Sequence, residues 1–101
     1  MPTTPNLAVP DLGEVSAILK RHLPAGYQAV LFGSRATGKA SPRSDWDIGL
    51  LGPNPLRSRL VGDIREELEE MQTLHTFDLV DLTTVPDYFR KSALRTAVNL
   101  I

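Results

Sequence analysis

Two aspartates one residue apart, Asp45 and Asp47, are the side chains of this sequence best suited to chemistry. In a β-strand, residues two apart point to the same side, so both carboxylates would project from one face of a sheet. Aspartate is unfavourable in strands, and like charges on one face repel each other. A divalent cation shared with phosphate oxygens would offset that cost, because hard cations such as magnesium bind carboxylates together with substrate phosphates. The pair therefore indicates a site for a metal and a phosphate.

A Gly-Ser pair upstream strengthens this interpretation. Gly33 and Ser34 end the apolar run 30–32 and precede Asp45 by ten intervening residues. A glycine directly after a strand lets the backbone approach a ligand closely, and the Ser34 hydroxyl with nearby amides can hold phosphate oxygens. An isolated Asp-x-Asp is more often a turn cap followed by an exposed strand residue. The upstream pair favours the phosphate site instead.

The combined spacing resembles the signature of the DNA polymerase β-like nucleotidyltransferases: Gly33-Ser34, ten residues, then an Asp-x-Asp over 45–47. The short length and the Gly-Ser-Arg-Ala start at 33–36 resemble the minimal nucleotidyltransferase (MNT) branch of that superfamily. This branch contains small prokaryotic proteins often encoded beside a helical HEPN-type partner. The resemblance covers roughly residues 27 to 101.

Two-metal nucleotidyl transfer needs a third acid, and the predicted strand 76–82 offers Asp78 and Asp81. Their odd separation puts them on opposite faces of a regular strand, so only one can join the site. Each shares its face with apolar residues, so the alternation alone does not decide. Position favours Asp78, because Asp81 lies where the chain is about to turn and could cap that turn. The resemblance agrees, since the family's third acid lies early in a comparable Asp-Leu-Val segment.

The resemblance implies that an acceptor oxygen attacks the α-phosphate of a nucleoside triphosphate and releases pyrophosphate. Asp45, Asp47 and Asp78 would hold two magnesium ions, which at about 3.5–4 Å apart stabilise the attacking and leaving oxygens. Asp78 is the candidate for taking the acceptor proton. Gly33 and Ser34 would hold the β- and γ-phosphates.

Basic residues of the same loop extend the candidate site. Arg35 is a candidate phosphate clamp, because a guanidinium group pairs bidentately with phosphate. The alternative is a surface arginine at the start of a helix. Lys39 and Arg43 lie further along the loop, and the sequence leaves their roles open.

The run 33–40 also comes close to a P-loop, whose pattern ends in Gly-Lys-Ser/Thr. Ala40 stands where that motif needs a metal-binding hydroxyl, and Pro42 follows where a P-loop opens into a helix. A short helical turn over 35–37, ended by Gly38, is the better prediction.

The resembled branch also implies an acceptor and a partner. The expected acceptor is a hydroxyl group on a cognate HEPN-type protein, the expected group is AMP from ATP, and the transferase would act as an antitoxin. Two alternatives stay open: a catalytically silent subunit that neutralises its partner by complex formation, and a transferase acting on a small molecule such as an aminoglycoside. Either homo- or hetero-oligomers are compatible with the sequence.

Composition narrows the function classes. The 101 residues, 42% hydrophobic and 23% charged, suit one soluble globular domain with a modest core. A net charge of −1 gives no electrostatic basis for non-specific nucleic-acid binding. The absence of cysteine excludes disulfides, a thiolate nucleophile and cysteine-bound zinc. No run resembles a signal peptide or a membrane span, so a cytoplasmic location is expected.

The predicted elements give the fold class. Three prolines make residues 1–10 an extended arm, and residues 11–101 form a single domain. Asp11 is expected to cap the first helix and Thr84 the last. This order of elements predicts an α/β domain, with a small mixed sheet of about three to four strands and helices packed on it. The predicted elements are a helix 12–23, strands 27–33 and 46–51, a helix 56–72, a strand 76–82, a helix 86–95 and a short terminal strand within 97–101.

Overall fold

The computed structural model describes residues 11–41, 44–71 and 73–101. The predicted arm over 1–10, Arg43 and the predicted last residue of the second long helix, 72, therefore lie outside the described residues. Helices and strands alternate as α1 (Leu12–His22), β1 (Gln28–Phe32), α2 (Ser34–Thr37), β2 (Trp46–Leu51), α3 (Ser58–Glu69), β3 (Phe77–Asp81), α4 (Asp87–Arg95) and β4 (Val98–Asn99).

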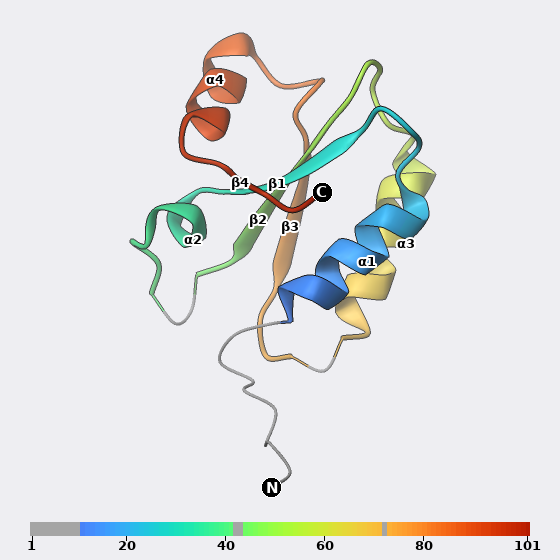
Figure 1. Ribbon diagram of the computed structural model, residues 1–101, viewed down its shortest axis with the longest axis horizontal. Coiled ribbons are helices and arrows are strands. Elements are labelled where there is room, and N and C mark those ends of the chain that lie inside the picture. The colour runs from blue at the N-terminus through green and yellow to red at the C-terminus, as the bar shows by residue number, and fades with distance from the viewer. Residues whose placement is uncertain (1–10, 42–43, 72) are drawn as a thin grey trace, which may run out of the picture.

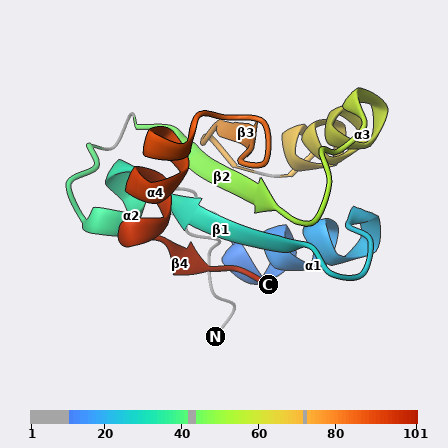
Figure 2. The ribbon, with the colours of Figure 1, turned by 90° about the horizontal axis from the view of Figure 1, so that it is seen from above.

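The four strands form one mixed sheet in the order β3-β2-β1-β4, which Figure 2 shows from above. β1 runs antiparallel to β2 and to β4. β2 and β3 are parallel, because α3 carries the chain back to the same end of the sheet. The predicted α/β class with a small mixed sheet is confirmed. Of the helices in the described ranges, none has the length and hydrophobicity that a bilayer crossing requires.

The sheet separates two apolar layers of different size. Figure 1 shows the helices on its two sides. α1 and α3 cover one face, and α4 covers part of the other. Successive side chains of β1 point to opposite faces and so contribute to both layers. Ala29 lies on the α1–α3 side, and Val30 and Phe32 lie on the α4 side. The larger layer is built on Val15, Ile18, Leu19, Ala29, Ile48, Leu50, Ile64, Leu68, Met71 and Leu79, and the smaller on Val30, Phe32, Leu82 and Ala93.

Local capping residues account for the start of α1 and for the end of α2. Asp11 caps α1 as predicted: its Oδ1 accepts hydrogen bonds from the amides of Gly13 at 2.9 Å and Glu14 at 3.2 Å. The predicted helical turn is α2, and it ends at Gly38 in the left-handed conformation with φ 77°.

The predicted cap of the last helix was wrong. α4 begins after Pro86, and the Thr84 hydroxyl donates instead to the carbonyl oxygen of Asp81 at 2.9 Å. Arg90 holds this turn in another way, because it donates to carbonyl groups instead of accepting from helix amides as a cap would. Its guanidinium group donates to the carbonyl oxygens of residues 82, 83 and 85 at 2.7, 3.5 and 3.2 Å. A long side chain from inside the helix therefore fixes the β3–α4 connection.

Leu82 packs directly against Gly49 in β2, and this contact is testable. A Cβ atom at Gly49 would stand 2.5 Å from Leu82 Cδ1, with Phe32 Cδ1 at 3.3 Å. We expect Gly49→Ala to lower the free energy of unfolding by about 1–3 kcal/mol, the usual cost of overpacking a core, in a urea titration.

Gly62→Ala is the matched control, because a Cβ atom at this position of α3 meets nothing within 4 Å. It should stabilise the protein by roughly 0.5–1 kcal/mol through helix propensity. An unchanged midpoint for Gly49→Ala would contradict the packing described here.

Candidate active site

Two carboxylates face each other across the parallel strands. Asp47 on β2 is the register partner of Asp78 on β3, so their side chains lie next to each other on one face. On the other side of Asp47, its antiparallel partner is Phe32 on β1, which belongs to the layer under α4. A row of Phe32, Asp47 and Asp78 thus crosses the sheet on the face that α4 partly covers.

Asp45 lies just before β2, exposed to solvent. The Thr76 hydroxyl donates a hydrogen bond to Asp45 Oδ1, and the Thr76 carbonyl accepts one from the Trp46 amide at 3.0 Å. Sequence reasoning missed Thr76. Only the parallel pairing of β2 with β3 brings it beside Asp45, and no local pattern reports that pairing.

Asp47 is electrostatically unfavourable in its ionised form. Partial burial raises the pKa of its carboxyl group, and the negative charges of Asp78 and Asp45 raise it further. A bound cation would relieve that repulsion. Within the described ranges, no three His, Cys, Asp or Glu side chains stand close enough, as placed, to enclose one ion. The carboxylate oxygens of the three aspartates are ligands that a hard cation prefers, but as placed they do not surround an ion.

Gly33 brings the backbone against Asp47. Its backbone, with φ of 74° and ψ of −154°, has a conformation that residues other than glycine rarely adopt. A Cβ atom here would stand 2.5 Å from Asp47 Oδ2. Its carbonyl accepts hydrogen bonds from Ala36 at 3.1 Å and Thr37 at 3.3 Å, which starts α2. The first residue of that helix is Ser34, half-buried beside Gly33. Gly33 therefore leaves open the space directly in front of a candidate metal ligand.

Arg35 makes contacts inside the protein. Its Cζ lies 4.5 Å from the centroid of the Trp46 ring, and its Nε and Nη2 donate to the Ser44 carbonyl at 3.3 and 3.0 Å. Nη2 also lies 3.4 Å from His75 Nδ1. Arg35 thus ties the start of α2 to the residue before Asp45. The phosphate clamp stays a prediction, and it would require Arg35 to exchange some of these contacts.

Asp81 lies away from the carboxylate row. Its Oδ2 accepts from the Leu56 amide at 2.8 Å, and its Oδ1 accepts from the Thr83 amide and hydroxyl at 3.0 and 2.6 Å. Partial burial acts to raise the pKa of Asp81, but the hydrogen bonds from Thr83 and Leu56 outweigh it, so that the pKa lies below its ordinary value. Asp81 anchors a turn and the loop before α3. Lys39, whose role the sequence left open, is exposed after α2.

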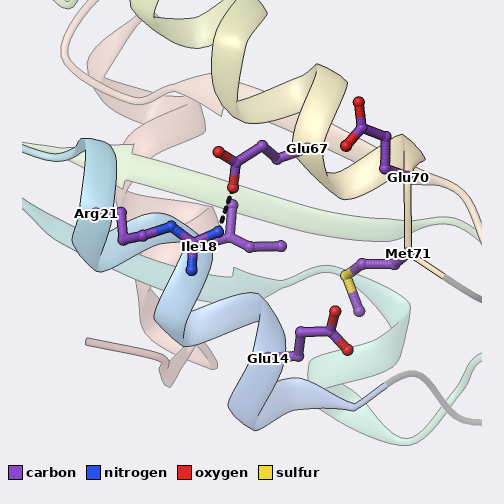
Figure 3. Close-up of a pocket in the computed structure, with 6 residues that line it drawn as sticks. All are labelled: Glu14, Ile18, Arg21, Glu67, Glu70 and Met71. Carbon is purple, nitrogen blue, oxygen red and sulfur yellow. Dashed lines mark hydrogen bonds and ion pairs between the residues drawn. The ribbon is translucent and has the colours of Figure 1, made fainter.

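Two of the hollows that the described residues form are candidate binding sites for the nucleotide. One, of about 270 Å³, reaches Gly33, which lies against Asp47. It is lined by Phe32, Gly33, Phe89, Ser92, Ala93 and Thr96. A larger one of about 380 Å³ lies between α1 and α3, on the other side of the sheet, where Glu67 pairs with Arg21 (Figure 3) and with His22 at 3.0 Å. The smaller hollow is favoured, because the larger one holds paired charges and lies on the opposite face of the sheet from Asp47 and Asp78. The larger hollow is lined by Glu14, Ile18, Arg21, Glu67, Glu70 and Met71.

Known proteins share this sequence pattern and fold. A family model described as "Polymerase beta, Nucleotidyltransferase" matches residues 14–101. A Haemophilus influenzae protein named "Probable protein adenylyltransferase MntA" is 32% identical over 81 residues, which are 80% of this chain and 70% of that protein.

Two solved structures show the same fold. One is a toxin–antitoxin structure with AMP-PNP, which matches with a TM-score of 0.75 and 22% identity over 90% of this chain and 73% of that one. The other is a tri-AMPylated HEPN toxin of Shewanella oneidensis in complex with an MNT antitoxin. It matches with a TM-score of 0.62 and 20% identity over 89% of this chain and 68% of that one.

The raised pKa of Asp47 predicts that Asp47→Asn stabilises the protein at neutral pH. An acid whose pKa is raised by folding destabilises the folded state at every pH above that pKa, and the amide removes this charge. We expect a gain of roughly 0.2–1 kcal/mol in urea unfolding at pH 7, the range for like charges opposite each other on strands. The gain should vanish below the pKa of Asp47 in the unfolded chain. Asp63→Asn, on the exposed side of α3, is the control and should change nothing; equal stability of Asp47→Asn and the native chain at pH 7 would disprove the repulsion.

Asp81→Asn should have the opposite effect. Because the pKa of Asp81 is lowered by folding, its stabilising contribution is present above the ordinary pKa and is lost as the pH falls through the folded-state value. Asparagine has one acceptor oxygen where aspartate has two, so either Leu56 or Thr83 would lose its acceptor, and we expect a loss of about 1–3 kcal/mol at pH 7. Chemical denaturation as a function of pH tests this, and the difference from the native chain should narrow in acid. A difference that stays constant across that range would rule out the ionised carboxylate as the acceptor.

Proposed function

This chain belongs to the polymerase β nucleotidyltransferase family, and we propose that it transfers AMP from ATP onto a hydroxyl group of a HEPN-type partner protein. The observation that carries the proposal is the pairing of Asp47 with Asp78 beside the open backbone of Gly33. The Haemophilus influenzae relative is named a probable protein adenylyltransferase, and one structural relative is bound to a tri-AMPylated HEPN toxin. These names support the choice of transferred group and acceptor.

The reaction forms a bond between the acceptor oxygen and the α-phosphorus of ATP. The bond from that phosphorus to the bridging oxygen breaks, and pyrophosphate leaves with the electron pair. The hydroxyl proton passes to Asp78 and from there to water. Asp78 suits this task because it is exposed, whereas Asp47 is half-buried. An acceptor can therefore reach Asp78 from solvent.

Magnesium is the cofactor that the donor set fits. Asp45, Asp47 and Asp78 offer oxygen atoms alone, and their mutual repulsion is the cost that a cation would offset. When bound, magnesium ions would neutralise phosphate charge and lower the pKa of the acceptor hydroxyl. Asp45 would exchange its hydrogen bond from Thr76 for this role, which fits an exposed side chain at a strand end.

The triphosphate would lie against Gly33 and Ser34. Gly33 leaves the space in front of Asp47 Oδ2 that a side chain would fill. Across the described part of the chain, the Ser34 hydroxyl makes no hydrogen bond as placed, so it is available to a phosphate oxygen. Arg35 would add positive charge nearby while it holds the Ser44 carbonyl.

The experiment combines the purified protein with magnesium, ATP labelled at the α-phosphate and a HEPN-type protein as the candidate partner. We expect label on that partner, and a loss of at least about 100-fold in rate for Asp78→Ala, the usual minimum for removing a general base. Asp47→Ala should abolish transfer, and Asp63→Ala, on the exposed side of α3, should retain it. Complex formation with the partner, followed by size-exclusion chromatography, should survive all three changes.

The outcomes separate the candidate functions. Transfer that does not depend on Asp47 or Asp78 would overturn the assigned site. A stable complex without any transfer of label would replace the proposal with neutralisation by binding alone.

A further inference from the structure

We propose that the hollow between α4 and the end of β1 receives the nucleoside part of the triphosphate, so that residues outside the sequence motif bind the sugar and base. This inference rests on the proposed function, because it assumes that phosphates are held at Gly33 and the carboxylates. It assigns a substrate-binding role to Phe89, Ser92 and Thr96 of the C-terminal part of the chain.

The position of the hollow follows from the row across the sheet. Phe32 lies on one side of Asp47 and Asp78 on the other. The hollow is on the Phe32 side, and Gly33 belongs both to its lining and to the open space against Asp47 Oδ2. Phosphates held at Gly33 therefore lie at the mouth of the hollow, and the rest of the nucleotide can enter it.

The lining of the hollow suits a nucleoside. Phe89, Ser92, Ala93 and Thr96 follow the spacing i, i+3, i+4 and i+7, which places them along one side of α4 and its C-cap. None of the six lining residues is charged, so the hollow lacks the cations that a phosphate group would need. Its volume of about 270 Å³ is near the lower end of small-molecule pockets.

Individual side chains offer the contacts that a base and a sugar require. Phe89 is 38% exposed and meets Phe32 edge to face, with centroids 6.1 Å apart, so part of its ring is available for stacking. The hydroxyls of Ser92 and Thr96 make no hydrogen bond to any described residue. They can therefore bond to sugar hydroxyls or ring nitrogens. Ala93, small and buried, leaves room between them.

The opposite side of the row is left for the acceptor. Asp78 lies on β3, an edge strand of the sheet, and its side chain is exposed. A nucleoside in the hollow under α4 would not block it. Nucleoside and acceptor thus reach the phosphates from different sides, so that neither blocks the other, and an acceptor beside Asp78 can attack opposite the leaving pyrophosphate.

The test compares the affinities of two probes in the presence of magnesium: ATP, and inorganic tripolyphosphate, which has no nucleoside. Calorimetry would measure both for the native chain, Phe89→Ala, Ser92→Trp and Tyr88→Ala. Ser92→Trp fills the hollow from an exposed position, so it tests the site without removing a core contact. Tyr88→Ala is the matched control, because Tyr88 is 76% exposed and does not line the hollow.

We expect Phe89→Ala and Ser92→Trp to raise the Kd for ATP by roughly tenfold, within the range for loss of stacking on an aromatic ring. The Kd for tripolyphosphate should stay unchanged in both, and Tyr88→Ala should bind both probes as the native chain does. Unchanged ATP affinity in Ser92→Trp, or an equal loss of tripolyphosphate affinity, would overturn the assignment of the hollow while leaving the transferase proposal intact. A native chain that binds neither probe would overturn the proposed function itself, and the nucleoside site with it.

Discussion

The parallel pairing of β2 with β3 places Asp47 beside Asp78, and the rest of the site is arranged around this unfavourable contact. Two carboxylates on neighbouring strands repel, so the register must be held by other residues. Ile48 and Leu79, the next register pair, are both buried in the larger apolar layer. A slip of one residue would turn these side chains toward the α4 face and solvent. Burial of Ile48 and Leu79 therefore holds the register that keeps Asp47 beside Asp78, although the two carboxylates repel each other.

A second constraint fixes the start of β2. Trp46 is buried with Arg35 stacked over its ring, and the Trp46 indole nitrogen has no hydrogen-bond partner in the ranges that the structure describes. The same arginine holds the Ser44 carbonyl, and Thr76 holds Asp45. Contacts on both sides of the first aspartate therefore set the direction in which the chain enters the sheet.

The parts of this molecule that sequence could predict are those that depend on local spacing. Residue periodicity located the helices and strands, and the motif named Asp45, Asp47 and Gly33, whose catalytic roles stay predictions. The choice between Asp78 and Asp81 was different. Alternation could not decide it, because apolar residues stand on both faces of β3 and the answer depends on which layer each face meets.

The contacts that could not be predicted from the sequence join segments that are far apart along the chain. Asp81 accepts from the Leu56 amide, 25 positions earlier, and Thr76 reaches Asp45 only through strand pairing. The side chains of α4 that line the hollow carry no motif, since their neighbours depend on how the helix docks on β1. Thr84 was mistaken for a cap because its hydroxyl bonds back to the Asp81 carbonyl and the helix starts only after Pro86.

β3 is an edge strand, so its Asp78 lies at the border of the sheet. A carboxylate at the rim of a sheet is open to water, and water is itself a nucleophile toward a phosphate. Discrimination between hydrolysis and transfer would then come from the shape of the acceptor protein, which would shield the nucleotide from water in the same step that presents its hydroxyl group.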